Sequence, residues 1–259
     1  MKPNNYMACL LGFVTLCLAP FLAHRIHAAD LPTVVQTIKP SIVGIGSYEK
    51  LRSPSVKFVG TGFAVGDGLS IITNAHVANA AAPGENELLG IVVGKGIEME
   101  FRPAKLVAKD PEHDLALLRI SGKPLPALEL GDSGKIVEGQ SVAFTGFPLG
   151  ILLGLNHATH RGIVSAITPI AMPALGSGRL DARMIAQLRK EPFPIFQLDG
   201  TAYPGNSGSP LYDPETGVVY GVINMVFVKG VKENAITNPS GITYAIPSKF
   251  ARDLLMQGK

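Results

Sequence analysis

Short runs of β-branched and other apolar residues recur along the chain from about residue 41, and Gly, Pro, Asp and Asn separate them. Such runs, bounded by turn-forming residues, are typical of β-strands. Because few helical patterns intervene, the sequence favours an all-β sandwich or barrel over a parallel α/β sheet. The predicted strands include residues 41–46, 63–65, 71–73, 91–93, 115–120, 142–144, 162–167, 218–223 and 242–246.

Helical patterns are few and short. Residues 32–38, residues 181–190 and the stretch after Ser248 carry apolar side chains at helical spacing. Asp181 and Ser248 suit the N-cap positions of the last two. We therefore expect short peripheral helices on a β body.

A segment rich in Gly and Pro, at residues 121–134, divides the chain near its middle. Such composition is typical of a linker. We therefore predict an N-terminal half at 30–125 and a C-terminal half at 126–259.

Residues 1–29 have the pattern of a secretory signal peptide. One Lys precedes a 16-residue apolar run at 8–23, and small residues at Ala28 and Ala29 suit cleavage. The run is shorter than the roughly 20 apolar residues that span a bilayer, so an uncleaved membrane anchor is the weaker interpretation. The sequence thus predicts export, with the periplasm as the first choice and secretion or membrane tethering as alternatives.

Both cysteines, Cys9 and Cys17, lie inside this apolar run. The mature chain would then have no disulfide, no thiol nucleophile and no cysteine-based metal site.

The charge balance argues against a nucleic-acid partner. Two of the 23 basic residues and none of the 20 acidic residues lie in 1–29, which leaves a net charge of +1 for the remainder. A nucleic-acid binder carries a clustered basic surface, and a charged partner is steered by a strong net charge.

Two residues at the ends of predicted strands could form a catalytic pair. His76 comes just after a buried strand, where a histidine is held rigidly at a surface, as a general base must be. Asp114 opens the apolar strand 115–120, from which a carboxylate can orient an imidazole and stabilise its protonated form. Asp110 and Glu112 could compete for that role, and a lone histidine is more often a packing residue.

Ser207 is the candidate nucleophile, in the sequence Tyr-Pro-Gly-Asn-Ser-Gly-Ser-Pro at 203–210. The neighbouring glycines let the N–H groups of Gly205 and Ser207 point at one spot beside the hydroxyl, so we assign the oxyanion hole to Gly205, Asn206 and Ser207. Ser209 replaces the last Gly of a Gly-x-Ser-x-Gly elbow, which excludes that motif. The alternative is that this segment is an ordinary structural turn without a catalytic role, because Gly, Pro and Asn also form such turns.

The order His76, Asp114, Ser207 is that of chymotrypsin, and the surrounding residues resemble the HtrA (Deg) group of bacterial trypsin-like serine proteases. The similar blocks, in family order, are Gly-Thr-Gly-Phe at 60–63, Thr-Asn-Ala-His-Val at 73–77, Asp-Pro-Glu-His-Asp-Leu-Ala-Leu-Leu at 110–118, Leu-Gly-Asp-Ser at 130–133, Gly-Phe-Pro-Leu-Gly at 146–150, Arg-Gly-Ile-Val-Ser-Ala at 161–166, Gln-Leu-Asp at 197–199, Pro-Gly-Asn-Ser-Gly at 204–208 and Tyr-Ala-Ile-Pro-Ser at 244–248.

This resemblance implies two antiparallel β-barrels of six strands each, with His76 and Asp114 in the first and Ser207 in the second. It implies peptide-bond hydrolysis through an acyl-enzyme, without a metal or organic cofactor, on protein substrates such as unfolded or exported proteins. It also suggests a homo-oligomer, a trimer in many members of the group.

The sequence departs from the family pattern in three places. Ser209 stands where the group usually has Gly, although glutamyl endopeptidases of the same fold carry a similar Gly-Asn-Ser-Gly-Ser-Pro. The chain stops at Lys259 without a PDZ domain, so we expect no regulation through one. Residues 168–196 are longer and richer in Pro, Met and Leu than the family's activation loops.

Specificity is predicted by the same resemblance. The residue six before the nucleophile floors the primary pocket in trypsin-like enzymes, and here it is Thr201, so cleavage after Lys or Arg is not expected. Val222, Ile223 and Asn224 would line the pocket wall, which favours small or medium aliphatic residues before the scissile bond.

Two alternatives from other classes stay open. The first is a binding or chaperone-like module that keeps the protease fold and has lost turnover. The second is a metal site built from His113, His157 and His160; the last two have helical-turn spacing, but they lie in a predicted loop without a carboxylate cluster.

Overall fold

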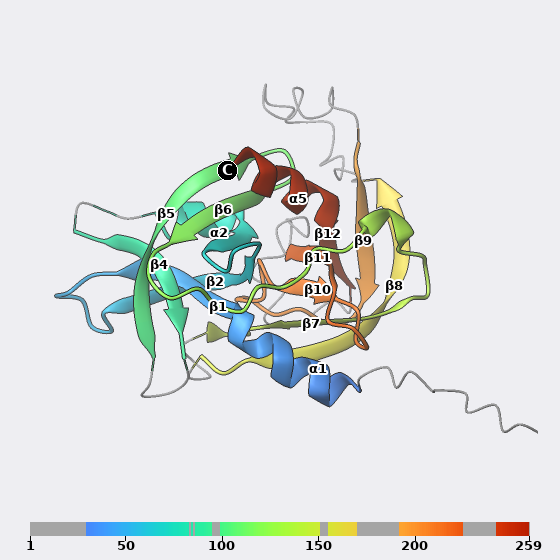
Figure 1. Cartoon of the computed structure of the whole chain (residues 1–259), viewed down its shortest axis with the longest axis horizontal. Helices are drawn as coiled ribbons and strands as arrows, with labels where there is room; N and C mark the ends of the chain where they lie inside the picture. The colour runs from blue at the N-terminus through green and yellow to red at the C-terminus, as the bar shows by residue number, and fades with distance from the viewer. Residues whose placement is uncertain are drawn as a thin grey trace, which may run out of the picture.

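Twelve strands form two closed antiparallel barrels in the part of the chain that the computed structural model describes (Figure 1). That part comprises residues 30–82, 84, 86–94, 99–150, 155–169, 192–224 and 242–258. The predicted signal peptide at 1–29 and the predicted helix at 181–190 lie outside it. The expected all-β fold with two six-stranded barrels is confirmed.

The first barrel has the strand order β1-β2-β3-β6-β5-β4 and closes between β1 and β4. Its strands are β1 (Ile42–Tyr48), β2 (Val56–Val65), β3 (Ser70–Asn74), β4 (Leu88–Val93), β5 (Glu100–Asp110) and β6 (Leu115–Ile120).

The second barrel has the strand order β10-β11-β12-β9-β8-β7 and closes between β7 and β10. Its strands are β7 (Ser141–Gly146), β8 (Ala158–Pro169), β9 (Pro194–Asp199), β10 (Pro210–Tyr212), β11 (Val219–Asn224) and β12 (Ile242–Pro247). The predicted half boundary at 125/126 falls in the segment that joins β6 to β7.

Short helices lie around the barrels: α1 (Leu31–Ile38), η1 (Lys39–Ser41), α2 (Ala75–Ala80), η3 (Ser133–Lys135) and α5 (Ser248–Gln257). The helices predicted at 32–38 and after Ser248 are confirmed. Ser248 is not the N-cap, however, because Pro247 occupies that position and the buried Ser248 hydroxyl donates to Gly131 O at 2.8 Å. No helix within the described residues is both long and apolar enough to cross a membrane.

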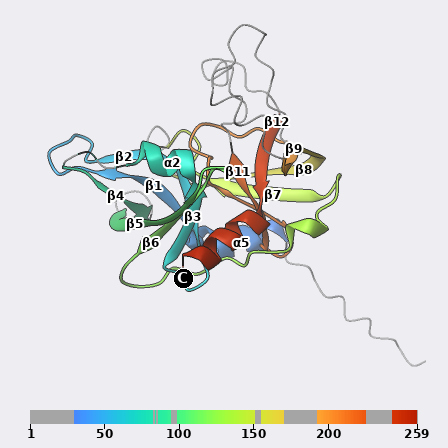
Figure 2. The ribbon, with the colours of Figure 1, turned by 90° about the horizontal axis from the view of Figure 1, so that it is seen from above.

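Side-chain alternation divides the apolar residues between barrel interiors and the junction of the barrels. On β6, Ala116, Leu118 and Ile120 fill the first barrel, whereas Leu115 and Leu117 join a cluster shared by both barrels. This is the period-2 pattern of a strand buried on both faces. Figure 2 shows β1–β6 on one side, β7–β12 on the other and α5 along the junction.

The predicted linker at 121–134 is held by backbone hydrogen bonds along its course. Leu128 N–H donates to Ala64 O at 2.8 Å on β2, and Gly131 N–H donates to Val219 O at 2.8 Å on β11. The linker therefore crosses from one barrel to the other as part of the packed structure.

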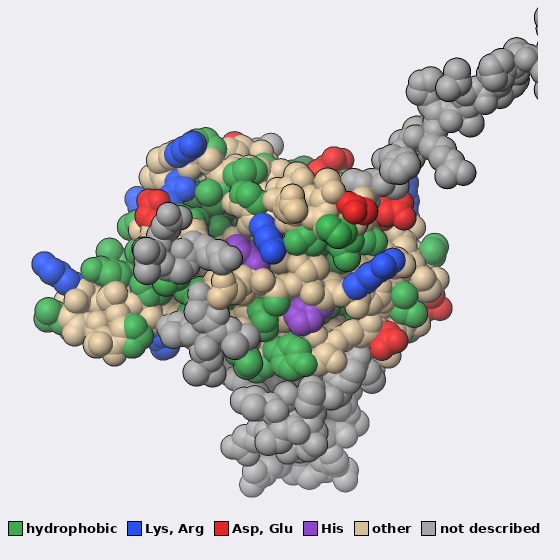
Figure 3. Space-filling model, turned by 90° about the horizontal axis from the view of Figure 1, so that it is seen from below, with side chains coloured by type: hydrophobic (Ala, Val, Ile, Leu, Met, Phe, Trp, Pro, Cys, Tyr) green, Lys and Arg blue, Asp and Glu red, His purple; other side chains and the backbone are tan. Residues whose placement is uncertain are grey.

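Basic and acidic side chains are interspersed on the face drawn in Figure 3, which agrees with a net charge near zero.

Candidate active site

His76 lies in the first turn of α2, directly after β3. Asn74, the last residue of β3, is fully buried, and its side-chain amide donates to Asp114 O at 3.1 Å. Ala75 N–H donates to the same carbonyl at 2.9 Å. The end of β3 thus fixes the backbone of Asp114 beside the helix that carries His76.

The Asp114 carboxylate accepts hydrogen bonds on both oxygens. His76 N–H donates to Oδ1 at 2.8 Å, and His76 Nδ1 lies 2.5 Å from Oδ2. An ionised carboxylate can only accept, so Nδ1 carries the proton and Nε2 is left with a lone pair. Asp114 itself has φ of 52°, a left-handed backbone in which Asp is enriched among non-glycine residues.

Of the three acidic residues that could have paired with His76, Asp114 is the one that does. Asp110 Oδ2 lies 2.6 Å from Nδ1 of another histidine, His113. The His113 ring stacks on Phe250 of α5, with the ring centroids 3.6 Å apart. Asp110 is therefore committed to a second histidine, between the first barrel and the C-terminal helix.

Asn224 supplies a further donor to the carboxylate. Its side-chain amide donates to Asp114 Oδ2 at 2.8 Å, and the residue is fully buried at the end of β11. The sequence predicts a different place for Asn224, in the wall of the primary specificity pocket. The available signal was a polar residue ending an apolar strand, because a buried amide requires a hydrogen-bond partner.

Ser207 lies in the turn between β9 and β10, and the residue is 7% exposed. Positive φ angles at Gly205 (102°) and Gly208 (88°) form this turn on either side of it. A Cβ at Gly205 would lie 2.2 Å from Phe147 O, and one at Gly208 would lie 2.0 Å from Thr61 O. Both positions therefore require glycine for conformation and for space.

The turn at residues 203–209, called the nucleophile turn here because it carries the candidate nucleophile Ser207, packs directly on the first barrel, close to α2. Thr61 N–H donates to Ser207 O at 2.9 Å. A Cβ at Gly60 would lie 3.1 Å from Ser207 O on one side and 2.8 Å from a methyl of Val77 on the other. Glycine at position 60 thus lets Ser207 approach the helix that carries His76.

The backbone donors of the turn differ in availability. Asn206 N–H donates to Tyr203 O at 2.9 Å, so it is already used inside the turn. The N–H groups of Gly205 and Ser207 have no hydrogen-bond partner among the described residues, which leaves them free to bind an anion. The Asn206 side chain is fully buried, and neither of its polar atoms has a partner within that part of the chain.

The structure places the remaining predicted specificity residues as follows. Thr201 is half-buried just after β9. Val222 and Ile223 are fully buried, in the shared cluster and in the core of the second barrel respectively. Their side chains thus fill cores, and the pocket roles assigned to them stay predictions.

The loop predicted for His157 and His160 is confirmed for His157, which directly precedes β8, but it is wrong for His160, which is part of that strand. His157 Nε2 lies 3.1 Å from Ile42 O. The His160 ring stacks on Phe144, with the centroids 4.8 Å apart, and burial lowers its pKa. No group of three or more His, Cys, Asp or Glu side chains suited to a metal occurs among the residues described.

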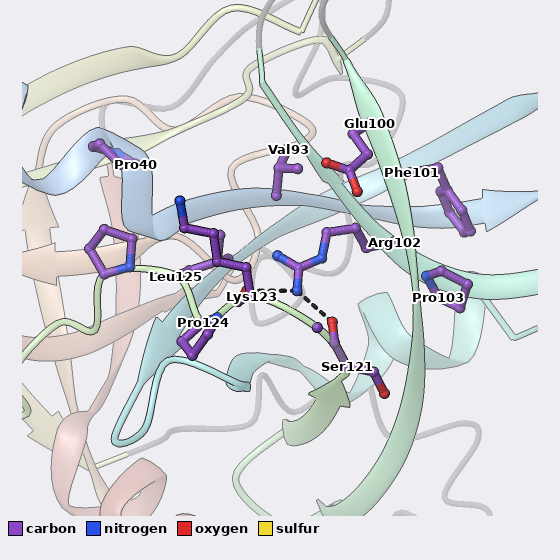
Figure 4. A pocket seen from close by; sticks show the side chains of 12 residues that line it. Pro40, Val93, Glu100, Phe101, Arg102, Pro103, Ser121, Lys123, Pro124 and Leu125 are labelled. Carbon is purple, nitrogen blue, oxygen red and sulfur yellow. Dashed lines mark hydrogen bonds between the residues drawn. The ribbon is translucent and has the colours of Figure 1, made fainter.

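A cavity of roughly 790 Å³ lies on the first barrel, away from these residues (Figure 4). Its lining comes from Pro40, the start of β5 and the beginning of the linker. Arg102 spans it and donates to Ser121 O at 2.5 Å and Lys123 O at 2.8 Å. The guanidinium thus ties β5 to the linker, and none of the candidate catalytic residues lines the cavity.

Comparison with known proteins identifies similar chains. Residues 60–222 match the family model of the trypsin-like peptidase domain. A Halomonas elongata protein described as a probable periplasmic serine endoprotease DegP-like is 33% identical over 212 residues, which cover 82% of this chain and 36% of the relative. A Pseudomonas putida protein of the same description is 32% identical over 209 residues, covering 80% and 36%. The chain thus spans about a third of the length of these relatives.

Solved structures agree with this similarity. The HtrA-type protease AlgW with a tripeptide superposes with a TM-score of 0.63 at 25% identity, covering 88% of this chain and 62% of that chain. A serine-to-alanine variant of the same protease, also with a tripeptide, gives a TM-score of 0.62 at 25% identity, covering 88% and 63%.

Proposed function

Because the chain belongs to the trypsin-like peptidase family, we propose that it is a serine endopeptidase in which His76, Asp114 and Ser207 form the catalytic triad. The observation that carries the proposal is the pairing of His76 Nδ1 with Asp114 Oδ2 at 2.5 Å. Unlike family membership alone, this contact defines which histidine nitrogen is free to act as a base.

In the proposed acylation, the Ser207 hydroxyl attacks the peptide carbonyl while His76 Nε2 takes its proton. A C–O bond forms, and the carbonyl oxygen becomes an oxyanion that the N–H groups of Gly205 and Ser207 stabilise. Each such donor contributes on the order of 3 kcal/mol. The imidazolium then protonates the departing amine as the C–N bond breaks, and the acyl-enzyme is left.

Deacylation repeats these steps with water. His76 takes a proton from the water, the hydroxide oxygen bonds to the acyl carbon, and the imidazolium returns the proton to Ser207 Oγ as the ester bond breaks. Asp114 holds the ring throughout and stabilises its charged form, without taking the proton itself. The donors to Asp114 keep its carboxylate in place between the two barrels.

We infer polypeptide substrates, with unfolded or exported proteins as the class. The relatives are described as periplasmic endoproteases, and AlgW was solved with bound peptides. Together with the pattern of residues 1–29, this supports export to the periplasm. A homotrimer is the assembly that the family resemblance favours.

The test uses the protein expressed from its full coding sequence, with Ser207→Ala as the matched control. Casein serves as the unfolded substrate, and a fluorophosphonate probe reports on the nucleophile. Casein cleavage and probe labelling that both disappear in Ser207→Ala are the expected result. A folded protein that neither cleaves casein nor reacts with the probe would contradict the proposal and favour the binding-module alternative.

A further inference from the structure

Thr61 is a fully buried polar residue between two glycines on β2. Its N–H donates to Ser207 O at 2.9 Å, and its carbonyl accepts from Thr73 Oγ1 at 2.7 Å. Its hydroxyl donates to Gly205 O at 2.7 Å and accepts from Phe147 N–H at 3.2 Å. Every polar group of Thr61 is used, and three of the four contacts reach the second barrel.

The carbonyl groups that precede Gly205 and Ser207 determine the directions in which the N–H groups of these two residues point. A trans peptide is planar, so its N–H points opposite to the C=O of the preceding residue. The direction of Gly205 N–H is therefore set by Pro204 O, which accepts from Leu149 N–H at 2.7 Å. In the same way, the direction of Ser207 N–H is set by Asn206 O, which accepts a hydrogen bond from Ser209 N–H at 3.0 Å.

Thr61 binds the other two carbonyls of this segment, Gly205 O and Ser207 O. Its hydroxyl donates to Gly205 O, and its N–H donates to Ser207 O. Thr61 thus supplies two of the four hydrogen bonds that the described residues donate to the carbonyls of residues 204–207. The Gly205–Asn206 peptide separates the two proposed oxyanion donors. One edge of it is held by Thr61 and the other by Tyr203 O, which accepts from Asn206 N–H.

We propose that Thr61 is a positioning residue for the reaction. Its hydroxyl fixes the Gly205–Asn206 peptide against Phe147, so that the N–H groups of Gly205 and Ser207 converge on one oxyanion. The inference rests on the proposed function and deepens it. Without the hydroxyl, the Gly205–Asn206 peptide keeps only the hydrogen bond from Asn206 N–H to Tyr203 O. Leu149 and Ser209 still hold the flanking carbonyls, but the peptide that sets the spacing between the two donors is held at one edge only.

A simple role in stability is the competing explanation, because any buried hydroxyl with two partners contributes to folding. Thr145 provides a matched comparison. It is fully buried in the second barrel, and its hydroxyl lies 2.8 Å from both Thr159 Oγ1 and Tyr212 OH. Neither partner belongs to the nucleophile turn.

The experiment compares Thr61→Ser, Thr61→Cys and Thr61→Val with Thr145→Val, all made in the full-length protein. Four quantities are measured: the rate constant of Ser207 labelling by the fluorophosphonate probe, kcat and KM for casein cleavage, and the melting temperature. Labelling depends on the oxyanion donors, because the phosphonyl oxygen occupies the same position as the carbonyl oxygen.

We expect Thr61→Val to label about 10- to 100-fold more slowly, a displaced donor costing less than the roughly 10²- to 10³-fold loss for a deleted one. The casein kcat should fall in parallel with KM nearly unchanged. Thr61→Ser should stay within about threefold of the original chain, with Thr61→Cys between them, since a thiol is a weak donor. Thr145→Val should lower the melting temperature and leave labelling within about threefold.

Equal labelling by Thr61→Val and the original chain would overturn the inference, as would equal losses in Thr61→Val and Thr145→Val. If Thr61→Val does not fold, Thr61→Ser and Thr61→Cys decide, and equal rates in these two would overturn it. Failure of the proposed function is distinguishable, because the original chain itself would then show no Ser207-dependent labelling.

Discussion

Asn224 donates from the second barrel to the carboxylate of Asp114 on the first, with Nδ2 2.8 Å from Oδ2. The same carboxylate oxygen pairs with His76 Nδ1. The orientation of the proposed catalytic histidine therefore depends on contact between the barrels. A hydrogen bond to a charged group contributes about 1.5–3 kcal/mol, enough to hold a carboxylate in one rotamer.

Replacing Asn224 by Ala should lower kcat for casein about tenfold or more, because Asp114 loses one of its fixed donors. The control is Asn79→Ala, which removes an exposed asparagine that accepts from Lys109 and should leave kcat unchanged. Melting curves establish that both variants are folded. An unchanged kcat in folded Asn224→Ala would contradict this role.

Asp114→Asn tests which nitrogen of His76 carries the proton. The new amide can donate toward Nδ1, which would place the imidazole proton on Nε2, where it cannot accept from Ser207. Activity should fall on the order of 10⁴-fold with little change in the melting temperature. A loss smaller than about tenfold would show that Asp114 does not select the tautomer.

Gly205→Ala and Gly139→Ala separate steric clash from backbone strain. Both glycines have positive φ, 102° and 83°, but a Cβ at Gly139 would meet nothing within 4 Å. We expect Gly139→Ala to cost about 1–2 kcal/mol of stability from the left-handed backbone alone. Gly205→Ala should cost about 1–3 kcal/mol more from overpacking against Phe147 O and should also abolish labelling of Ser207. Equal losses of stability would exclude the clash.

The strands that are buried on both faces could be predicted from the sequence. The β6 segment is a continuous apolar run that the sequence predicts at its observed bounds, 115–120. β5 was not predicted, since its sequence mixes Arg102, Pro103 and Lys105 with apolar residues and every residue of the strand is at least partly exposed. β10 has three residues, too few for a periodic pattern.

Some residues of the candidate site could be predicted from the sequence, and others could not. Residue types in sequence predicted His76, Asp114 and Ser207, and the structure brings the first two into contact. The contacts of Asn224 and Thr61 depend on how one barrel docks on the other, and local sequence carries no information about that register. The placement of Val222 and Ile223 has the same cause, because both are apolar residues that barrel packing buries.

We expect the burial of His160 to make the folded protein less stable at acidic pH than at neutral pH. Burial lowers the pKa of its ring from an ordinary value near 6.5, so the folded chain favours the neutral form. Below about pH 6.5 the unfolded chain binds a proton that the folded chain resists, and the free energy of unfolding decreases as the pH falls further. Denaturant titrations at pH 7.5 and 5.5 measure this. His160→Phe, which keeps an aromatic ring beside Phe144, should reduce the difference between the two pH values. An identical difference in both proteins would rule out His160 as its source.

Thr201 predicts the primary specificity. A threonine at the position that floors the pocket in trypsin-like enzymes offers no carboxylate to pair with a Lys or Arg side chain. Transferring either charge into a partly buried pocket without a counter-charge is costly, so uncharged residues of small or medium size should precede the cleaved bond. Digestion of a peptide library derived from a denatured proteome, with Ser207→Ala as the blank, gives the cleavage profile. Enrichment of Ala, Val or Ile at the first position before the bond is the expected outcome. A profile dominated by Lys, Arg or Glu would require a charged group elsewhere in the pocket, and Thr201 could not then be its floor.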